Sequence, residues 1–244
     1  YLRDLGHNDG LEQLIDAVEK IDGVKTARIL YLYPSTTTHN LIDKIADSKV
    51  FVNYFDMPLQ HISQNMLKIM KRGKGAEKLI ELMNYMKSKP NSFVRTTFIA
   101  GHPGESEEDF EELCSFVEEF GFDRGNVFSY SDEEGTSAET RDDKIEQELI
   151  DERAEILGDI ISQTTIKSLE NDIGKSFEVY IDGESEEHEY LLSARKTIWA
   201  PQIDGEIYIN DNEDNIPIVF GEIYEVEATQ LAGDKLLAKI IRKV

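Results

Sequence analysis

Cysteine, basic residues and long apolar runs are all scarce in this sequence of 244 residues. Its one cysteine, Cys114, excludes an internal disulfide and a metal site built from several cysteines of this chain. No apolar run is long enough to cross a membrane, and no stretch reads as a signal peptide. We therefore expect a soluble protein that has no membrane partner and is located in the cytoplasm.

The sequence also lacks a methionine at its start, and it begins at Tyr1 in a polar stretch typical of a loop. We expect from this that the N-terminal part of a longer protein is missing. Lysine and arginine number 26 and are outnumbered by 49 aspartates and glutamates, which gives a formal net charge of -23. Such a charge repels polyanions at long range and attracts basic molecules. Free nucleic acid is therefore not the first partner that the composition predicts.

The clearest pattern in the chain is a strand, a turn and a helix within residues 91–120. Residues 93–99 are rich in β-branched and aromatic side chains, as a buried strand is, and they stop at a Gly-His-Pro-Gly turn. Ser106 and Asp109 have the spacing of a capping box at a helix start. In folds of repeated βα units, a glycine turn at the carboxyl end of a strand is where ligands bind. The apolar face of the predicted helix consists of Phe110, Leu113, Cys114, Val117 and Phe120.

Strands and helices alternate through the first two thirds of the sequence. Further strands are predicted at residues 27–33, 50–56 and 125–131, and helices at residues 11–21, 38–47, 64–71, 76–89 and 144–171. This alternation is typical of βαβ units, so it predicts an α/β fold with a parallel sheet.

After Gly174 the pattern changes to short strands without helices. They are predicted at residues 177–181, 190–194, 205–209, 223–228 and 236–241, separated by Gly, Asp and Asn turns. Five such strands predict a small, OB-like, antiparallel β-barrel. We therefore expect two domains, at residues 1–171 and 172–244, with acidic loops at residues 184–187 and 211–214 on the second.

Three predicted strands end in turns that carry glycine, proline or polar side chains. These turns lie at residues 58–61, 101–105 and 131–135. The carboxyl ends of parallel strands share one edge of a sheet, so the three turns should converge there. Any one of them has a sufficient explanation as a turn that only shapes the backbone. Together they predict a ligand site.

Several residues near these turns have both a functional and a structural interpretation. Histidine as a residue type titrates near neutral pH, so His61 and His102 are candidates for catalysis. Neither has a partner at the spacing of a metal site or a catalytic triad, so hydrogen bonding within turns is favoured. Cys114 lies on the apolar helix face and is interpreted as a packed core thiol. The basic residues Lys71, Arg72 and Lys74 could hold an anionic group or simply be solvated, and the sequence leaves both interpretations open.

Two acidic residues and one aromatic residue are candidates for substrate contact. Glu133 and Glu134 could act as acid-base carboxylates or recognise a cation at the edge of the sheet. Trp199, next to Pro201 in the small barrel, suits either the barrel core or a recognition surface.

The motifs taken together resemble a known family. Met57-Pro58-Leu59-Gln60-His61, Met70-Lys71-Arg72-Gly73, Gly101-His102-Pro103-Gly104-Glu105, Tyr130-Ser131 and Glu134-Gly135-Thr136 are similar, in order and spacing, to the radical S-adenosylmethionine (SAM) methylthiotransferases. The final segment resembles their TRAM domain. The resemblance implies a partial (βα) TIM-like barrel of parallel strands, of which this chain is the C-terminal part, followed by the small barrel.

Two motifs resemble one branch of this family. Residues 133–136 and 200–205 look like the branch that methylthiolates an aspartate of a basic small-subunit ribosomal protein, protein twelve. An acidic enzyme also suits a basic protein better than it suits tRNA, so the charge favours the same partner. The tRNA-modifying branch is the alternative, and a non-catalytic adaptor for a ribosomal protein or RNA is another. We expect a monomer.

The resemblance also implies cofactors and contacts. The family uses SAM and two 4Fe-4S clusters, whose cysteine ligands are absent from this chain and are expected upstream of Tyr1, so this chain alone is expected to be inactive. The substrate contacts are expected to be Glu133, Glu134 and Trp199. The residues expected to contact SAM are Gln60, Arg95, Phe98, Ile99, Gly101, Pro103 and Gly104.

Overall fold

A computed structural model describes residues 5–73, 75–212 and 215–244. Tyr1, Lys74 and two residues of the predicted acidic loop 211–214 lie outside the described residues. The chain divides into two compact units, Tyr1–Ser162 and Gln163–Val244, and the division falls within helix α6 (Gln147–Glu170). The division that we predicted between residues 171 and 172 follows the end of this helix and stays a prediction.

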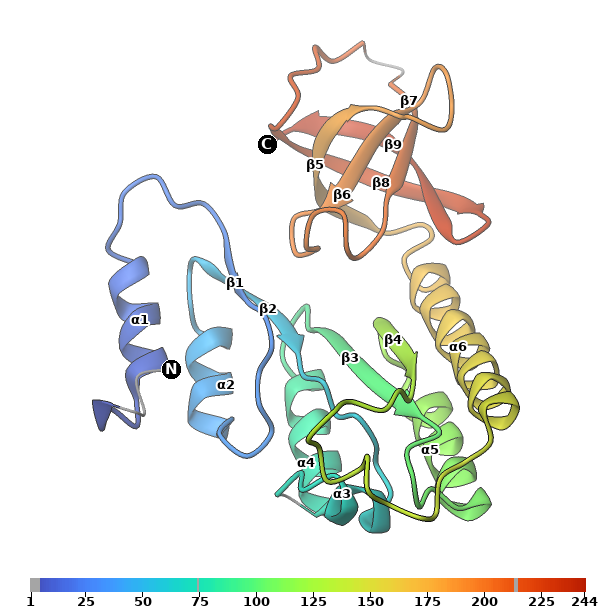
Figure 1. The fold of residues 1–244 in the computed structure, drawn as a ribbon. Coiled ribbons are helices and arrows are strands. Elements are labelled where there is room, and N and C mark those ends of the chain that lie inside the picture. The colour runs from blue at the N-terminus through green and yellow to red at the C-terminus, as the bar shows by residue number, and fades with distance from the viewer. Residues whose placement is uncertain (1–4, 74, 213–214) are drawn as a thin grey trace. The chain divides into compact units, whose positions relative to one another are not determined.

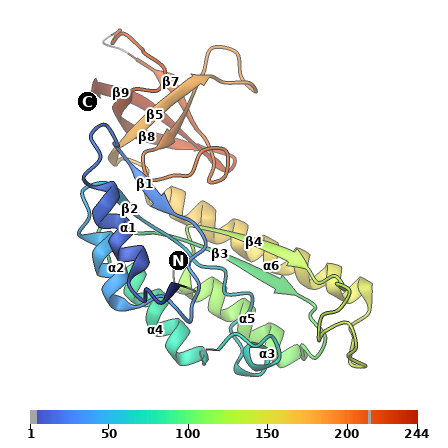
Figure 2. The ribbon, with the colours of Figure 1, turned by 60° about the vertical axis from the view of Figure 1, so that its left-hand side comes forward.

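In the described part of the N-terminal unit, four strands form one parallel sheet (Figures 1 and 2). Their order is β1 (Ala27–Ile29), β2 (Phe51–Asp56), β3 (Phe93–Ala100) and β4 (Arg124–Ser129). Sequence order and spatial order agree, as they do in one side of a βα barrel. The prediction of a parallel α/β fold is confirmed.

Helices precede or connect the strands and supply most of the core. They are α1 (Gly10–Val18), α2 (His39–Ala46), α3 (Gln64–Ile69), α4 (Ala76–Lys87) and α5 (Glu107–Phe120). Alternate side chains of the sheet pack against them, for example Phe55, Val94 and Phe98. The capping box predicted for α5 is present: Ser106 accepts from the Asp109 amide, and Asp109 accepts from the Ser106 amide.

Strand β1 is shorter than the predicted strand at residues 27–33. The backbone leaves the sheet at Tyr31, which has a φ of 61°, in the left-handed region. The Asp56 carboxylate accepts from the Tyr31 amide at 3.2 Å, and the Asp56 carbonyl accepts from the Leu32 amide at 2.7 Å. These two bonds replace the regular ladder, so Tyr31 and Tyr33 lie largely exposed beside the end of the sheet.

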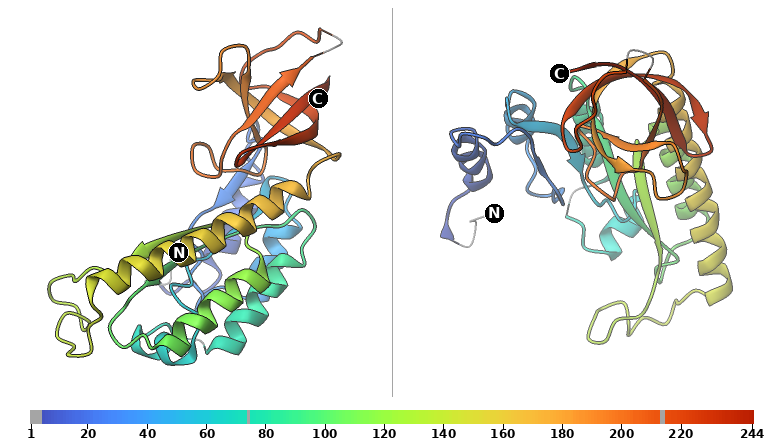
Figure 3. Two further views of the ribbon diagram at one scale, coloured as in Figure 1. Left: turned by 90° about the vertical axis from the view of Figure 1, so that its right-hand side faces the viewer. Right: turned by 90° about the horizontal axis from the view of Figure 1, so that it is seen from above.

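The described residues of the C-terminal unit contain a closed barrel (Figure 3). Its strands run β5 (Ser176–Glu184), β6 (Leu192–Lys196), β7 (Ile207–Asp211), β9 (Lys235–Lys243) and β8 (Ile223–Ala232). The predicted OB-like barrel is confirmed, but it is mixed rather than antiparallel. The β8–β9 hairpin places β9 next to β7 with the same direction, so this one pair is parallel. Closure removes free strand edges.

Among the described residues, no helix combines the length and the apolar character that crossing a membrane requires.

Candidate functional site

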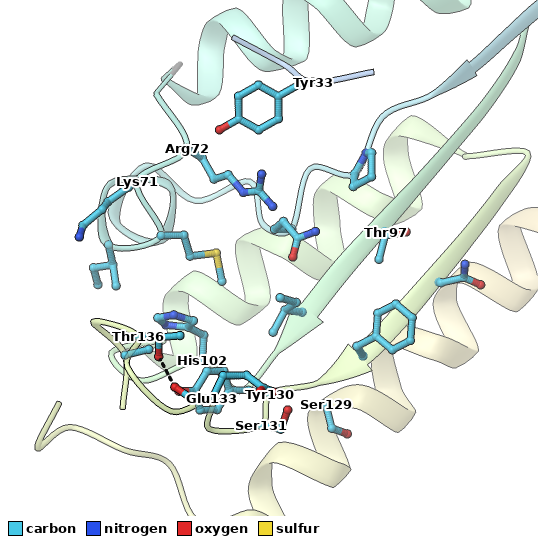
Figure 4. A pocket seen from close by; sticks show the side chains of 18 of the residues that line it. Tyr33, Lys71, Arg72, Thr97, His102, Ser129, Tyr130, Ser131, Glu133 and Thr136 are labelled. Atoms are coloured by element: carbon cyan, nitrogen blue, oxygen red, sulfur yellow. Dashed lines mark hydrogen bonds between the residues drawn. The ribbon is translucent and has the colours of Figure 1, made fainter. Parts of the chain in front are cut away.

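A cavity of about 930 Å³ lies at the carboxyl-terminal edge of the parallel sheet (Figure 4). The three predicted turns contribute to it: Gln60 follows β2, His102 follows β3, and Ser131 and Glu133 follow β4. Tyr33 and the segment after α3 complete the wall. The structure therefore brings together the strand ends that the sequence analysis grouped. A cavity of this size lies within the range of small-molecule sites, roughly 300–1,000 Å³.

The alternation of side chains along β3 determines which of the predicted cofactor contacts on this strand line the cavity. Side chains alternate along a strand, so Arg95, Thr97 and Ile99 line the cavity. Phe98 is fully buried on the other face, with its ring 5.8 Å from the ring of Phe122. Phe98 is therefore a core residue, and its contact with a cofactor stays a prediction. Contact of Ile99 and Arg95 with a cofactor stays a prediction.

Gln60 is fixed in the cavity wall by its backbone. Its amide donates to the Thr97 carbonyl at 2.9 Å, and its carbonyl accepts from the Ile99 amide at 2.9 Å. Gln60 also has a φ of 69°, which is uncommon for a residue other than glycine. Residues are found in such conformations mainly where the surrounding structure holds them, often at functional sites.

Arg95 is held by a buried carboxylate, Asp56, which was not among the predicted site residues. Its Nη1 lies 3.1 Å from Asp56 Oδ1, and the Asp56 side chain is fully buried. The side-chain amide of Asn126 is oriented so that its oxygen faces Arg95, and this oxygen accepts a hydrogen bond from Arg95 Nη2 at 2.7 Å. Asp56 thus neutralises the arginine and fixes its direction. The position of Asp56 at the last residue of a strand was a signal that could have identified it.

The glycine turn after β3 supports the cavity from outside. Gly101 has a φ of 80°, and a Cβ there would lie 2.6 Å from Ile150 Cγ1 of α6. A Cβ on Gly104, whose φ is 87°, would lie 2.8 Å from Arg141 Nη2. Neither these glycines nor Pro103 lines the cavity. The absence of a side chain at the two glycines serves the packing of the turn, and contact of Gly101, Pro103 and Gly104 with a cofactor stays a prediction.

A buried charged network joins the turns after β2 and β3 to α6. The Glu105 carboxylate accepts from the Gly101 amide at 2.9 Å and from Arg153 Nη1 at 2.8 Å. His61 Nδ1 accepts from the Ser63 amide at 3.0 Å, so Nε2 carries the proton and donates to Glu105 at 3.2 Å. His61 therefore has the turn-bonding role that we predicted, and Glu105 is the residue on which the network converges.

A third buried carboxylate, Asp109, ties α3 to α5. It accepts from the Ser63 hydroxyl, from Asn65 Nδ2 at 2.8 Å and from the Ser106 amide at 3.1 Å. Burial acts to raise the pKa of Asp109, but the hydrogen bonds from Ser63, Asn65 and Ser106 outweigh it and lower the pKa below its usual value.

We expect Asp109→Asn to destabilise the N-terminal unit by about 1–3 kcal/mol at neutral pH. The asparagine NH2 group is a donor, so it cannot accept the hydrogen bonds that Ser63, Asn65 and Ser106 donate to the carboxylate. A carboxyl with a lowered folded-state pKa contributes stability that is fully present above its unfolded pKa of about 4 and is lost as the pH falls through the folded value. The difference between wild type and variant should therefore shrink below pH 4, as urea denaturation would show. Glu108→Gln, on the exposed side of the same turn, is the control and should behave like wild type.

His102 and Tyr130 form the lower wall of the cavity in Figure 4. The His102 ring packs edge-on against Tyr130, at a centroid distance of 5.0 Å, and its Nδ1 donates to the Pro103 carbonyl at 2.9 Å. Burial lowers the pKa of His102, so the ring is neutral at neutral pH. Burial and the bond from its hydroxyl to Asp132 raise the pKa of Tyr130 to about 12. Both groups are thus held uncharged against the cavity.

The three predicted substrate contacts lie in different surroundings. Glu133 lines the cavity, whereas Glu134 is exposed and does not. Trp199 belongs to the barrel of the other unit and is 2% exposed, with Lys196 Nζ 5.6 Å from its ring centroid. Trp199 therefore packs in the barrel core, and its contact with a substrate stays a prediction. Cys114 is half-buried, and burial raises its pKa to about 11, so it is an unreactive thiol packed in the core.

Two family models match the chain. Residues 5–117 match the radical SAM superfamily, and residues 173–241 match the TRAM domain. The chain is 77% identical, over 99% of its length, to a ribosomal protein uS12 methylthiotransferase RimO from Aliarcobacter butzleri, of which it covers 55%. It is 59% identical to the protein of that name from Sulfurovum and 53% identical to that from Campylobacter jejuni; in both comparisons all of the chain aligns with 55% of the relative.

The chain thus spans about half the length of the curated relatives that it matches. Both predicted domain types and their order are confirmed by these matches. The chain therefore carries a segment similar to the radical SAM superfamily followed by a TRAM domain, and nearly all of it is similar to part of the uS12 methylthiotransferases.

Proposed function

We propose that this chain is part of an enzyme that transfers a methylthio group to ribosomal protein uS12, at the β-carbon of an aspartate. The observation that carries the proposal is the cavity at the carboxyl edge of the parallel sheet, lined from the ends of β2, β3 and β4. Relatives at 53–77% identity over nearly the whole chain are named for this activity. We propose that the same cavity binds SAM.

The lining of the cavity suits SAM. Ile99, Met70 and Phe128 give apolar surface for the adenine ring, while Gln60 and Arg95 give polar groups. When bound, SAM supplies the radical chemistry of the family. The chain's own residues hold the ligand: Gln60 through a fixed backbone, Arg95 through its pair with Asp56, and Ile99 as an apolar contact from the sheet.

The side chains of this sequence do not fit the clusters of the family. A 4Fe-4S cluster is held by cysteine thiolates, and the 244 residues contain one cysteine. Within the described residues, no three His, Cys, Asp or Glu side chains converge as a metal site requires. The proposal therefore assigns to this chain the binding of SAM and of the substrate, and no step at a cluster.

Binding of SAM to the chain tests the proposal. We expect calorimetry to show saturable binding of SAM, and Ile99→Ala to weaken it about fivefold to tenfold, because the variant removes apolar contact area from the cavity. Ile156→Ala makes the same change on an exposed part of α6 and should leave the affinity unchanged. Equal affinities of the wild type and Ile99→Ala would exclude this cavity as the SAM site.

The barrel carries an acidic groove that suits a basic substrate. A cavity of about 710 Å³ is lined by five acidic residues, Asp182, Glu184, Glu186, Glu187 and Glu206, and by the basic residues Arg195 and Lys235. Both cations are paired: Lys235 Nζ lies 2.7 Å from Glu187 and 3.1 Å from Glu206, and Arg195 Nε lies 2.9 Å from Asp182. The groove is therefore net negative, which supports docking of a ribosomal protein rather than tRNA.

Titration against purified uS12 and, separately, unmodified tRNA tests this docking. We expect salt-sensitive binding to uS12 and none to tRNA, because exposed charges attract at long range and are screened by salt. Replacing Glu184 and Glu186 together by glutamine should weaken binding about fivefold. The matched change of Glu118 and Glu119, exposed on α5, should have no effect. Preference for tRNA would instead favour the tRNA-modifying branch of the family.

A further inference from the structure

Two cationic side chains lie at the mouth of the cavity in the N-terminal unit with no acidic partner among the described residues. Lys71 and Arg72 line the cavity directly after α3. Across residues 5–73, 75–212 and 215–244, no carboxylate oxygen lies within 4.0 Å of either side-chain nitrogen group, although the chain carries a net charge of -23. Glu133 is the acidic residue among the described residues of the cavity lining. The cavity mouth is therefore locally positive in an acidic protein.

The backbone that presents these side chains adopts an uncommon conformation for its sequence. The Lys71 amide donates to the Lys68 carbonyl at 3.2 Å, and the Arg72 amide donates to the Leu67 carbonyl at 2.8 Å. This is a Schellman end to a helix, in which the residue in the left-handed conformation is usually glycine. Here it is Lys71, with a φ of 56°. The left-handed conformation costs roughly 1–2 kcal/mol for a residue with a side chain, so the structure retains lysine here against its backbone preference.

Arg72 is directed over the cavity by an aromatic contact. Its guanidinium carbon lies 5.7 Å from the centroid of the Tyr33 ring, and Figure 4 shows the side chain extending beside Tyr33 into the upper part of the cavity. A cation held over an aromatic face keeps its N–H groups available for an anion. Arg95 differs, because Asp56 already neutralises it at 3.1 Å. Arg72 is therefore the guanidinium that is available to bind an added anion.

We propose that Lys71 and Arg72 form a subsite that binds a carboxylate of the substrate segment. The identity of that substrate rests on the proposed function. A guanidinium fork matches the two oxygens of a carboxylate and neutralises its charge, and the Lys71 ammonium group offers further donors to the same group. A nucleic-acid backbone would instead require a broader basic surface, whereas the chain as a whole repels polyanions. The methionine carboxylate of SAM has the same chemistry, so the test separates the two sources.

Nuclear magnetic resonance of the whole chain tests the subsite with a small probe, N-acetyl-aspartate N-methylamide. We expect the probe to shift the Arg72 Nε–Hε signal saturably, and the matching asparagine compound to leave it unchanged. Arg72→Gln and Lys71→Gln should each weaken binding of the probe about tenfold, as measured on the signals of neighbouring residues, because a charge-assisted hydrogen bond is lost. Lys68→Gln, exposed on α3, removes the same charge outside the cavity and should stay within twofold of wild type.

Competition identifies the source of the carboxylate. If the probe still binds when the chain is saturated with SAM, the subsite serves the substrate as proposed. Displacement of the probe by SAM would assign the subsite to SAM and overturn the proposal, as would tighter binding of inorganic phosphate or the absence of a saturable shift. If the probe binds as expected but uS12 does not, the proposed function fails and the carboxylate subsite stands.

Discussion

Replacing Glu105 by alanine is expected to destabilise the N-terminal unit by about 3–5 kcal/mol, because it removes the buried carboxylate that pairs with a buried cation and leaves that cation only an exposed partner. Arg153 is 4% exposed and loses the carboxylate at 2.8 Å. The Gly101 amide and His61 Nε2 lose their acceptor at the same time. Because these groups fix the turns after β2 and β3, we also expect SAM binding to be lost.

Two optical signals separate this effect from changes in the barrel. The one tryptophan of the sequence, Trp199, lies in the barrel core, so its fluorescence reports the C-terminal unit. Helices α1 to α5 belong to the N-terminal unit, so far-ultraviolet circular dichroism reports that unit. In urea denaturation of Glu105→Ala, the circular dichroism transition should move to lower urea concentration while the fluorescence transition stays in place.

Glu107 provides the matched control for Glu105. It also lies 2.8 Å from Arg153, but its side chain is 63% exposed. Exposed ion pairs contribute little, so Glu107→Ala should cost less than about 1 kcal/mol. The double variant Glu105→Leu with Arg153→Met replaces the buried pair by apolar groups and should recover much of the lost stability. Equal costs for Glu105→Ala and Glu107→Ala would show that the buried network does not have the role that we assign to it.

Gly101→Ala is expected to have the second largest effect, a loss of about 2–4 kcal/mol. Two costs add: the left-handed φ of 80°, and contacts of 2.6 to 2.9 Å between the new Cβ and the side chain of Ile150. Relief requires a shift of α6 or of the turn. The same circular dichroism measurement should show the loss.

Gly135→Ala separates the two costs. Gly135 has a φ of 79°, nearly the same as Gly101, but no atom lies within 4 Å of a Cβ built there from the described residues. Its replacement should therefore cost only the backbone term, about 1–2 kcal/mol. Adding Ile150→Ala removes two of the three close contacts of the new Cβ. The loss of stability caused by Gly101→Ala should therefore be smaller in the Ile150→Ala background than in the wild type. If Gly101→Ala cost no more than Gly135→Ala, the contact with α6 would not be the reason for this glycine.

The order of elements and the place of the site could be predicted from local patterns. The capping box and the apolar face predicted helix α5, and the glycines predicted the turn after β3. The strand-rich C-terminal third predicted a barrel, and the short strand ends predicted a shared edge. These signals are readable because each depends on residues that are neighbours in sequence.

Local patterns could not predict which side chains of β3 face the cavity and which face the core. Both faces of this parallel strand are largely covered, so Phe98 and Ile99 are both apolar and the period of two is hidden. The core position of Phe98 was hidden in the sequence for this reason. In the barrel, the parallel β7–β9 pair depends on where a hairpin inserts, which no strand pattern encodes.

The sequence by itself determined the two kinds of domain, the turns that meet at the cavity and the lack of ligands for a cluster, because composition, capping and periodicity are local properties. Only the tertiary structure decided that Glu105 pairs with Arg153, 48 residues away, and Asp56 with Arg95, 39 residues away. It also decided that Arg72 lies unpaired at the cavity mouth within the described chain, beside Tyr33. Whether a charged side chain has an ion-pair partner or can bind a ligand depends on which distant elements pack against it, and this depends on the tertiary structure of the whole unit.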